Sequence, residues 1–203
     1  MAQVFFQSIG SFAMHKGLFM SFPLILAATA GFAQEGGQDA DLAEAMALTE
    51  RFATTLQKEL KAAMTEGGPQ NAVKVCRERA PAIAAEISEE SGWAVGRTSL
   101  KLRNAELNAP DDWERAVLVR FDERQVAGED VATMTVAEVV ESDDGSRFRF
   151  MKAIPTVQLC LSCHGKIVNA SVGTALAEAY PEDQARGYQV GDVRGAFTLS
   201  KPR

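Results

Sequence analysis

The strongest constraint on this chain is a cluster of its scarce sulfur and imidazole groups. Cys160, Cys163 and His164 stand in the spacing C-x-x-C-H, in a sequence of 203 residues with only three cysteines and two histidines. This spacing is the attachment signature of c-type haem. The two thiols can each add to a vinyl group on one porphyrin edge, and the next residue presents its imidazole to the iron. The motif therefore predicts one covalent haem c, with Cys160 and Cys163 as thioether residues and His164 as the proximal iron ligand.

Other chemistries of the same residues explain the pattern less well. A thioredoxin-like redox pair belongs at a helix N-terminus in a βαβ unit, whereas this motif falls late in the chain. Cys76, Cys160, Cys163 and His164 add up to a Cys₃His zinc set, although adjacent ligands such as Cys163 and His164 converge poorly on one ion. A Cys160–Cys163 disulfide would leave Cys76 unpaired and His164 unexplained.

The first 33 residues have the order of a secretory signal peptide. A cation, Lys16, precedes the apolar run Gly17–Ala30, and small residues follow. We expect cleavage between Ala33 and Gln34, or else between Ala30 and Gly31, which makes residues 34–203 a single periplasmic haem-binding domain. An uncut membrane anchor is the alternative, since the uncharged run of 18 residues is close to the ~20 needed to span a bilayer.

Charge and composition narrow the choice of partners. Apolar residues make up 46% of the chain, which is enough for a hydrophobic core, and the net charge is −6. The basic residues are scattered along the chain, so we expect no nucleic-acid partner. A redox or signalling protein of unknown identity is the expected partner, and a membrane only if the leader is retained.

The second axial ligand of the iron follows less directly from the residues. If the leader is removed, His15 is lost and His164 is the only remaining histidine. The candidates are then the Cys76 thiolate, an open position, or one of four methionines, Met46, Met64, Met134 and Met151. Cys76 shares a helical stripe with Val73, Ala80, Ile83 and Ile87, and an isolated cysteine on such a face is usually a small buried hydrophobe. Arg77 and Arg79 lie beside it in sequence and would favour its thiolate.

The chain also resembles a known family, over about residues 40 to 200. The resemblance rests on these blocks: Val75-Cys76 followed by Ala80-Pro81; Gly96-Arg97-Thr98-Ser99-Leu100-Lys101 with Arg103-Asn104; Asn108-Ala109-Pro110-Asp111-Asp112-Trp113-Glu114; Cys160-Leu161-Ser162-Cys163-His164-Gly165; and Tyr180-Pro181 with Asp183, Ala185, Gly187-Tyr188, Gly191-Asp192 and Arg194-Gly195-Ala196.

These blocks resemble exported c-type haem domains with a PAS-like fold, first described in a cyanobacterial haem protein with mixed cysteine and histidine ligation. Such domains occur alone and as the extracytoplasmic sensing part of histidine kinases. The resemblance implies that His164 is the proximal ligand and that Cys76 is the distal ligand.

Sequence periodicity predicts an α+β fold, which the resemblance describes as a PAS-like antiparallel sheet with flanking N-terminal helices and one covalently bound haem. We expect a helix over 41–66 that is broken at Gly67-Gly68-Pro69, and a second helix through Ser91. A helix over 110–125 is expected to start with Pro110 in its first turn. The strands are expected at 93–100, 131–140, 147–154 and 193–200, with a hairpin turn over 142–145.

Several further residues are weaker candidates for the haem site. Arg97, Arg103, Asn104 and Arg194 are candidates for contacts with the haem propionates, because a guanidinium forms paired, charge-assisted hydrogen bonds with a carboxylate. Each is more often a surface residue. Trp93, Trp113, Tyr180 and Tyr188 are candidates to flank the porphyrin, although buried aromatic residues usually belong to the core.

Cysteine and histidine ligation favours a low-potential haem and a role in sensing redox state or a small ligand. A soluble electron carrier is the alternative, because it needs only an accessible haem edge. A peroxidase-type enzyme ranks last, because the processed chain offers no distal histidine.

Overall fold

The computed structural model describes residues 30–142 and 145–203. The predicted leader lies almost entirely outside the described residues, and the expected cleavage point falls in the first turn of α1. Within the described ranges, no helix combines the length and the apolar character needed to cross a membrane.

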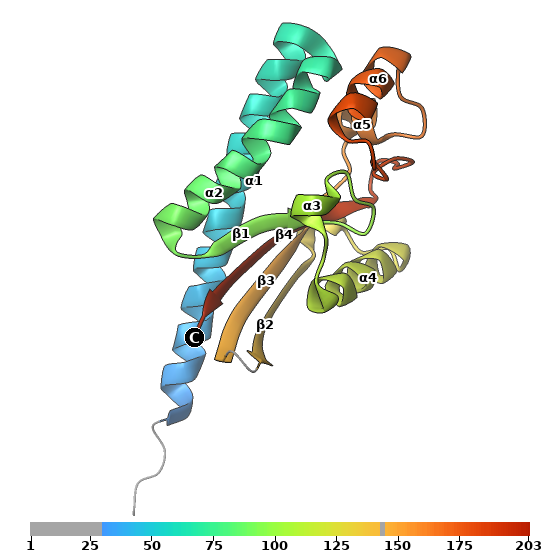
Figure 1. Cartoon of the computed structure of the whole chain (residues 1–203). Helices are drawn as coiled ribbons and strands as arrows, with labels where there is room; N and C mark the ends of the chain where they lie inside the picture. Colours follow the sequence, from blue (N-terminus) through green and yellow to red (C-terminus); the bar gives the residue numbers. More distant parts are fainter. Residues whose placement is uncertain (1–29, 143–144) are drawn as a thin grey trace, which may run out of the picture.

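A helical hairpin forms the N-terminal part of the fold. α1 (Ala30–Lys74) runs to Gly67 and Gly68, whose φ angles of −143° and +69° break the helix at the predicted place. The chain reverses at this break, and the returning helix consists of the last residues of α1, the π-helical segment η1 (Val75–Arg79) and α2 (Ala80–Ser91), which runs back along α1 (Figure 1). Both predicted helices are confirmed, although α1 begins earlier than expected.

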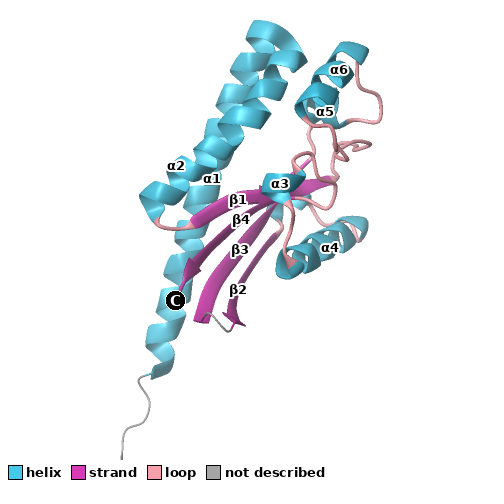
Figure 2. Ribbon diagram, viewed as in Figure 1, coloured by secondary structure: helices cyan, strands magenta, loops and turns pink. Residues whose placement is uncertain are grey.

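The sheet contains β1 (Ala94–Thr98), β2 (Thr135–Ser142), β3 (Gly145–Pro155) and β4 (Val193–Pro202). Its order is β1-β4-β3-β2, and all neighbouring strands are antiparallel (Figure 2). The expected hairpin is confirmed by the pairing of Ser142 with Gly145, while Asp143 and Asp144 lie outside the described residues.

Two expected boundaries were wrong. Residues 131–133, predicted as strand, form the 3₁₀ turn η2 (Val131–Thr133), because the Asp130 carboxylate accepts a hydrogen bond from the Ala132 amide and holds a turn there. Pro110 precedes α4 (Asp112–Val126) instead of forming its first turn. The N-cap of α4 is Asp111, which forms a reciprocal capping box with Glu114.

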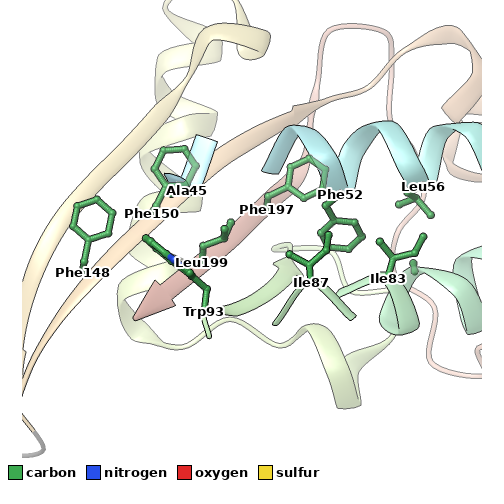
Figure 3. Packing of buried hydrophobic residues seen from close by; sticks show 11 residues of the cluster. Ala45, Phe52, Leu56, Ile83, Ile87, Trp93, Phe148, Phe150, Phe197 and Leu199 are labelled. Atoms are coloured by element: carbon green, nitrogen blue, oxygen red, sulfur yellow. The ribbon is translucent and has the colours of Figure 1, made fainter. Parts of the chain in front are cut away.

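Alternating side chains give the sheet two apolar faces. On one face, Phe148 and Phe150 of β3 and Phe197 and Leu199 of β4 pack against α1, α2 and Trp93 (Figure 3). On the other face, a second cluster lies beneath α4. Its members are Val117, Leu118, Phe121, Val131, Met134, Met151, Ala153, Val193 and Ala196. The predicted α+β architecture with flanking N-terminal helices is confirmed.

Short helices lie toward one end of this sheet. They are α3 (Ala105–Asn108), η3 (Gln158–Cys160), α5 (Leu161–His164) and α6 (Ala170–Ala179). Two of them, η3 and α5, carry the C-x-x-C-H motif. Val172 and Leu176 of α6 pack with Tyr180 against Val73, near the end of α1. This contact brings the motif to the end of the helical hairpin where η1 lies (Figure 1).

Candidate functional site

The C-x-x-C-H motif forms one tight turn. Cys160 ends η3, with its amide bonded to the Val157 carbonyl at 2.9 Å, and His164 is the last residue of α5. The Gly165 amide closes the turn on the Leu161 carbonyl at 3.0 Å. A Cβ at position 165 would lie 2.6 Å from that carbonyl oxygen, so only glycine allows the chain to leave the turn directly after His164.

All three cysteines are half-buried and free in the described structure, so Cys160 and Cys163 do not form the alternative disulfide. Among the described residues there is also no group of three or more histidine, cysteine or acidic side chains arranged to hold a metal ion.

The His164 imidazole is held from several sides. Its Nδ1 lies 2.8 Å from the Ala185 carbonyl oxygen, and its Nε2 lies 3.4 Å from Nη1 of Arg103. Nε of Arg194 lies 3.1 Å from Nδ1 and 3.4 Å from Nε2, and the Tyr188 ring packs edge-on at a centroid distance of 6.2 Å. Burial, reinforced by the charges of Arg194 and Arg103, lowers the pKa of His164 to about 2. The ring is therefore neutral at pH 7, the form in which imidazole binds iron.

Cys76 lies in η1, the π-helical turn between α1 and α2. Single π turns are often found at functional sites. Cys163 packs against the cluster of Val73, Val172, Leu176 and Tyr180, and Val73 precedes Cys76 by three residues. Burial raises the pKa of the Cys163 thiol, and the neighbouring Cys76 and Cys160 add to the rise while Arg103 opposes it. The fold thus brings Cys76 near the C-x-x-C-H motif.

The cations beside Cys76 are not those expected from its sequence neighbours. Arg79 pairs with Glu59 at 2.8 Å and with Glu86 at 3.5 Å, and Arg77 is exposed. Arg97 and Arg194 are instead the guanidinium groups whose pKa values respond to the charge of Cys76. Strand pairing supplies these groups from distant parts of the chain.

The methionine candidates are placed differently from Cys76. Met134 and Met151 are fully buried in the cluster beneath α4, where they pack as core residues. Met46 is 49% exposed on α1, and Met64 is half-buried on the same helix.

Three of the four propionate candidates meet at the site. Burial lowers the pKa of Arg97 and of Arg194, whereas Arg103 is paired with Asp183. In the part of the chain that the structure describes, no carboxylate forms an ion pair with Arg97 or Arg194. The nearest groups that they contact are the Phe52 ring for Arg97, and His164, Ser99 and Tyr188 for Arg194. Both side chains are half-buried, and partly desolvated charges without counter-ions are costly, so this cluster is suited to a ligand that carries carboxylates.

The fourth candidate, Asn104, has a local role. Its Oδ1 accepts a hydrogen bond from the Leu107 amide at 3.1 Å and caps α3. The aromatic candidates divide in the same way. Tyr180 and Tyr188 lie at the site, whereas Trp93 belongs to the core. Trp113, in the first turn of α4, packs against Arg149 of β3.

Sequence reasoning missed the residues that hold His164 in place. Asp183 binds Arg103, Ala185 offers its carbonyl to His164, and Ser99 accepts a hydrogen bond from Arg194 at 3.1 Å. The contacts through Ala185 involve a backbone carbonyl, which leaves no residue-type signal in a sequence. Asp183 and Ala185 did stand in the family-like block around Tyr180, and that was their only signal.

Comparison with known proteins gives two matches. A sequence model described as Tll0287-like matches residues 34–202. The crystal structure of the cyanobacterial heme-protein Tll0287 matches with a TM-score of 0.60 and 25% sequence identity, and the match covers 81% of this chain and 96% of that chain. A search of curated proteins found no significant match.

Proposed function

The chain belongs to the Tll0287-like family, and on this premise we propose that it is a periplasmic haem protein with one covalent haem c. Cys160 and Cys163 hold the porphyrin through thioether bonds, His164 is the proximal ligand, and Cys76 is the distal ligand. The observation that carries this proposal is the packing of Cys163 on the cluster that contains Val73, one helical turn from Cys76. This packing brings Cys76, from the N-terminal half of the chain, close to the motif, which lies in the C-terminal half.

The side chains of the site fit the group chemically. Imidazole held neutral by burial and a half-buried thiol are both iron ligands. Arg97 and Arg194, which have no carboxylate partner among the described residues, supply charges for the two propionates. When bound, the haem supplies a one-electron couple whose potential depends on its axial ligands.

We propose that the protein senses redox state or a small ligand. Cys76 sits in a π turn, which has one residue more than the corresponding α-helical turn. If Cys76 is released, the π turn is free to change its winding, and α2, which continues directly from it, is displaced along α1, against which it packs. α1 extends far beyond the sheet (Figure 1), so its distal end can present the change to a partner protein.

An electron carrier is the second candidate, supported by exposed apolar residues around the motif. Val157, Ile167 and Val190 are 50%, 92% and 59% exposed. The Thr156 amide donates a hydrogen bond to the Asp192 carbonyl, and the Thr156 carbonyl accepts one from the Gly191 amide, so the Val157 and Val190 segments lie together. An exposed apolar rim suits brief docking of a redox partner. Unchanged axial ligation in both oxidation states would favour the carrier, and ligand exchange on reduction would favour the sensor.

The haem assignment is tested first with the purified, exported full chain. An alkaline pyridine haemochrome spectrum should show one covalent haem per chain, and replacement of both Cys160 and Cys163 with alanine should abolish attachment. Colourless protein, or protein that carries zinc, would refute the proposal.

The distal ligand is tested with Cys76→Ala, using Val75→Ala in the same turn as the matched control. Cys76→Ala should keep the covalent haem, lose the thiolate features of the ferric optical and spin-resonance spectra, and raise the reduction potential, because a thiolate stabilises ferric iron. Val75→Ala should retain the wild-type spectrum. A Cys76→Ala spectrum identical to that of the wild type would reject Cys76 as a ligand.

Export is supported by agreement between two boundaries. The family match begins at residue 34, the first residue after the predicted cleavage point. Mass spectrometry of the periplasmic fraction should find a chain that begins at Gln34. An intact N-terminus recovered from the membrane fraction would instead identify the leader as an anchor.

A further inference from the structure

A buried network connects Asp183 with the imidazole of His164. The Asp183 side chain is 4% exposed, and its Oδ1 accepts hydrogen bonds from the Ala185 amide at 2.9 Å and from Nε of Arg103 at 3.1 Å. Its Oδ2 accepts from Nη2 of Arg103 at 3.2 Å and from Nε of Arg186 at 3.0 Å. The Asp183 carboxylate therefore fixes both Ala185 and Arg103.

Each of these two neighbours acts on one nitrogen of His164. A carbonyl oxygen can only accept a hydrogen bond, so the Ala185 carbonyl, at 2.8 Å, selects the imidazole with its proton on Nδ1. A guanidinium can only donate, so Nη1 of Arg103, at 3.4 Å from Nε2, favours a lone pair on that nitrogen. Both contacts stabilise the same tautomer, in which Nε2 carries the lone pair that a metal would bind. Nε of Arg194 can only donate and lies 3.1 Å from Nδ1 and 3.4 Å from Nε2, so it opposes this tautomer at Nδ1 and supports it at Nε2, and the shorter contact of Nδ1 with the Ala185 carbonyl outweighs the opposition.

Arg103 also ties this network to the C-x-x-C-H turn. Its Nη2 donates to the Cys163 carbonyl at 2.6 Å and to the Ala185 carbonyl at 3.2 Å. The Arg103 side chain is 8% exposed, so its donors have little access to water and need protein partners. The Arg103–Asp183 ion pair thus joins the turn that carries His164 to the loop whose Ala185 carbonyl accepts the hydrogen bond from Nδ1.

We propose that Asp183 is the positioning residue of the His164 imidazole. Through Ala185 and Arg103 it sets the Nδ1-protonated tautomer and the ring orientation before any ligand binds. The inference deepens the proposed function, because a ligating histidine is tuned by the group that accepts its other N–H. The tautomer and orientation of the imidazole are set by the polypeptide alone, so they can be tested without haem.

The first experiment uses the haem-free full chain with Cys160→Ala and Cys163→Ala, and with His15→Gln so that His164 is the only histidine. Imidazole ¹⁵N chemical shifts at pH 7 should show mainly the Nδ1-protonated form. Asp183→Ala should reduce the ratio of the two tautomers by about fivefold, the equivalent of one hydrogen bond of ~1 kcal/mol. Asp183→Asn keeps an acceptor oxygen for the Ala185 amide and should recover most of the wild-type ratio.

Asp192→Ala is the matched control. Asp192 lies in the same loop region and accepts a hydrogen bond from the Gln189 amide at 2.7 Å, but its carboxylate binds neither Ala185 nor Arg103 in the described structure. It should leave the tautomer ratio unchanged. An unchanged ratio in folded Asp183→Ala, a ratio in Asp183→Asn no higher than in Asp183→Ala, or an equal loss in Asp192→Ala would overturn the inference.

A second experiment measures the consequence in the exported, haem-loaded protein. Asp183→Ala should keep the pyridine haemochrome yield while its ferric spin-resonance signal broadens and its reduction potential rises, because the imidazole donates less strongly without an aligned acceptor. A wild-type signal and potential in this variant would contradict the inference. Absence of haem from the wild type itself would refute the proposed function and leave the tautomer result standing.

Discussion

Gly195 allows two strands to meet beside Arg194, and replacing it with alanine should separate them. Its φ is +154°, and an added Cβ would lie 2.4 Å from the Thr98 carbonyl oxygen and 3.0 Å from Cβ of Ser99. Ordinary Cβ contacts begin near 3.4 Å, so β1 and β4 would have to move apart by about 1 Å. Ser99 would move with them, although its hydroxyl group bonds both the carbonyl and the guanidinium of Arg194.

The loss in the free energy of unfolding has two sources, backbone strain and displacement of the strands. Backbone strain at a positive φ costs about 1–3 kcal/mol, and displacement of packed strands costs a similar amount. We therefore expect Gly195→Ala to lower the free energy of unfolding by about 2–6 kcal/mol. For a chain of this length, at about 2–4 °C per kcal/mol, this corresponds to a fall in Tm of roughly 4–24 °C.

Gly96 supplies the matched control on the neighbouring strand. A Cβ at Gly96 would lie 3.7 Å from Cγ2 of Thr198, an ordinary contact, so Gly96→Ala should be neutral or stabilising by up to about 1 kcal/mol. Urea unfolding followed by circular dichroism measures both variants. If Gly195→Ala costs no more than Gly96→Ala, the close approach of the strands does not control stability and the reasoning fails.

Three further predictions concern the core and the buried charges. Phe52 is 1% exposed and packs on Phe197, so Phe52→Ala should cost about 3–5 kcal/mol in urea unfolding, and a loss below 1 kcal/mol would contradict the observed packing. Arg97 is half-buried and has no carboxylate partner among the described residues, so Arg97→Met should stabilise the haem-free chain by about 1–4 kcal/mol; destabilisation of the haem-free chain would show that the charge is already compensated. Burial raises the pKa of Asp41, but hydrogen bonds from Lys201 and Arg203 outweigh it and hold the pKa below its ordinary value of 3.8. The stabilisation is therefore complete above pH 3.8 and is lost as the pH falls through the pKa of Asp41 in the folded protein. Asp41→Asn should lower the free energy of unfolding at pH 7 and have a smaller effect in acid. An effect independent of pH would argue against these ion pairs.

The sequence predicted most of the fold because the signals for these elements are local. The Gly67-Gly68-Pro69 break, the alternating strands 147–154 and 193–200, and the hairpin at 142–145 follow from backbone preferences and periodicity. The two wrong boundaries lie where a side chain caps a turn or helix. The Asp130 carboxylate binds the Ala132 amide and begins η2, and the Asp111 carboxylate binds the Glu114 amide and begins α4.

For the site, the sequence by itself determined that two thiols and an imidazole stand together in C-x-x-C-H, because their spacing is a covalent property of the chain. The tertiary structure alone decided what surrounds that motif. It replaced Arg77 and Arg79 by Arg97 and Arg194 beside Cys76, assigned Asn104 to a helix cap, and recruited Asp183 and Ala185 around His164. These contacts depend on strand register and on loops that meet through backbone carbonyls, so no pattern of neighbouring residue types could have specified them.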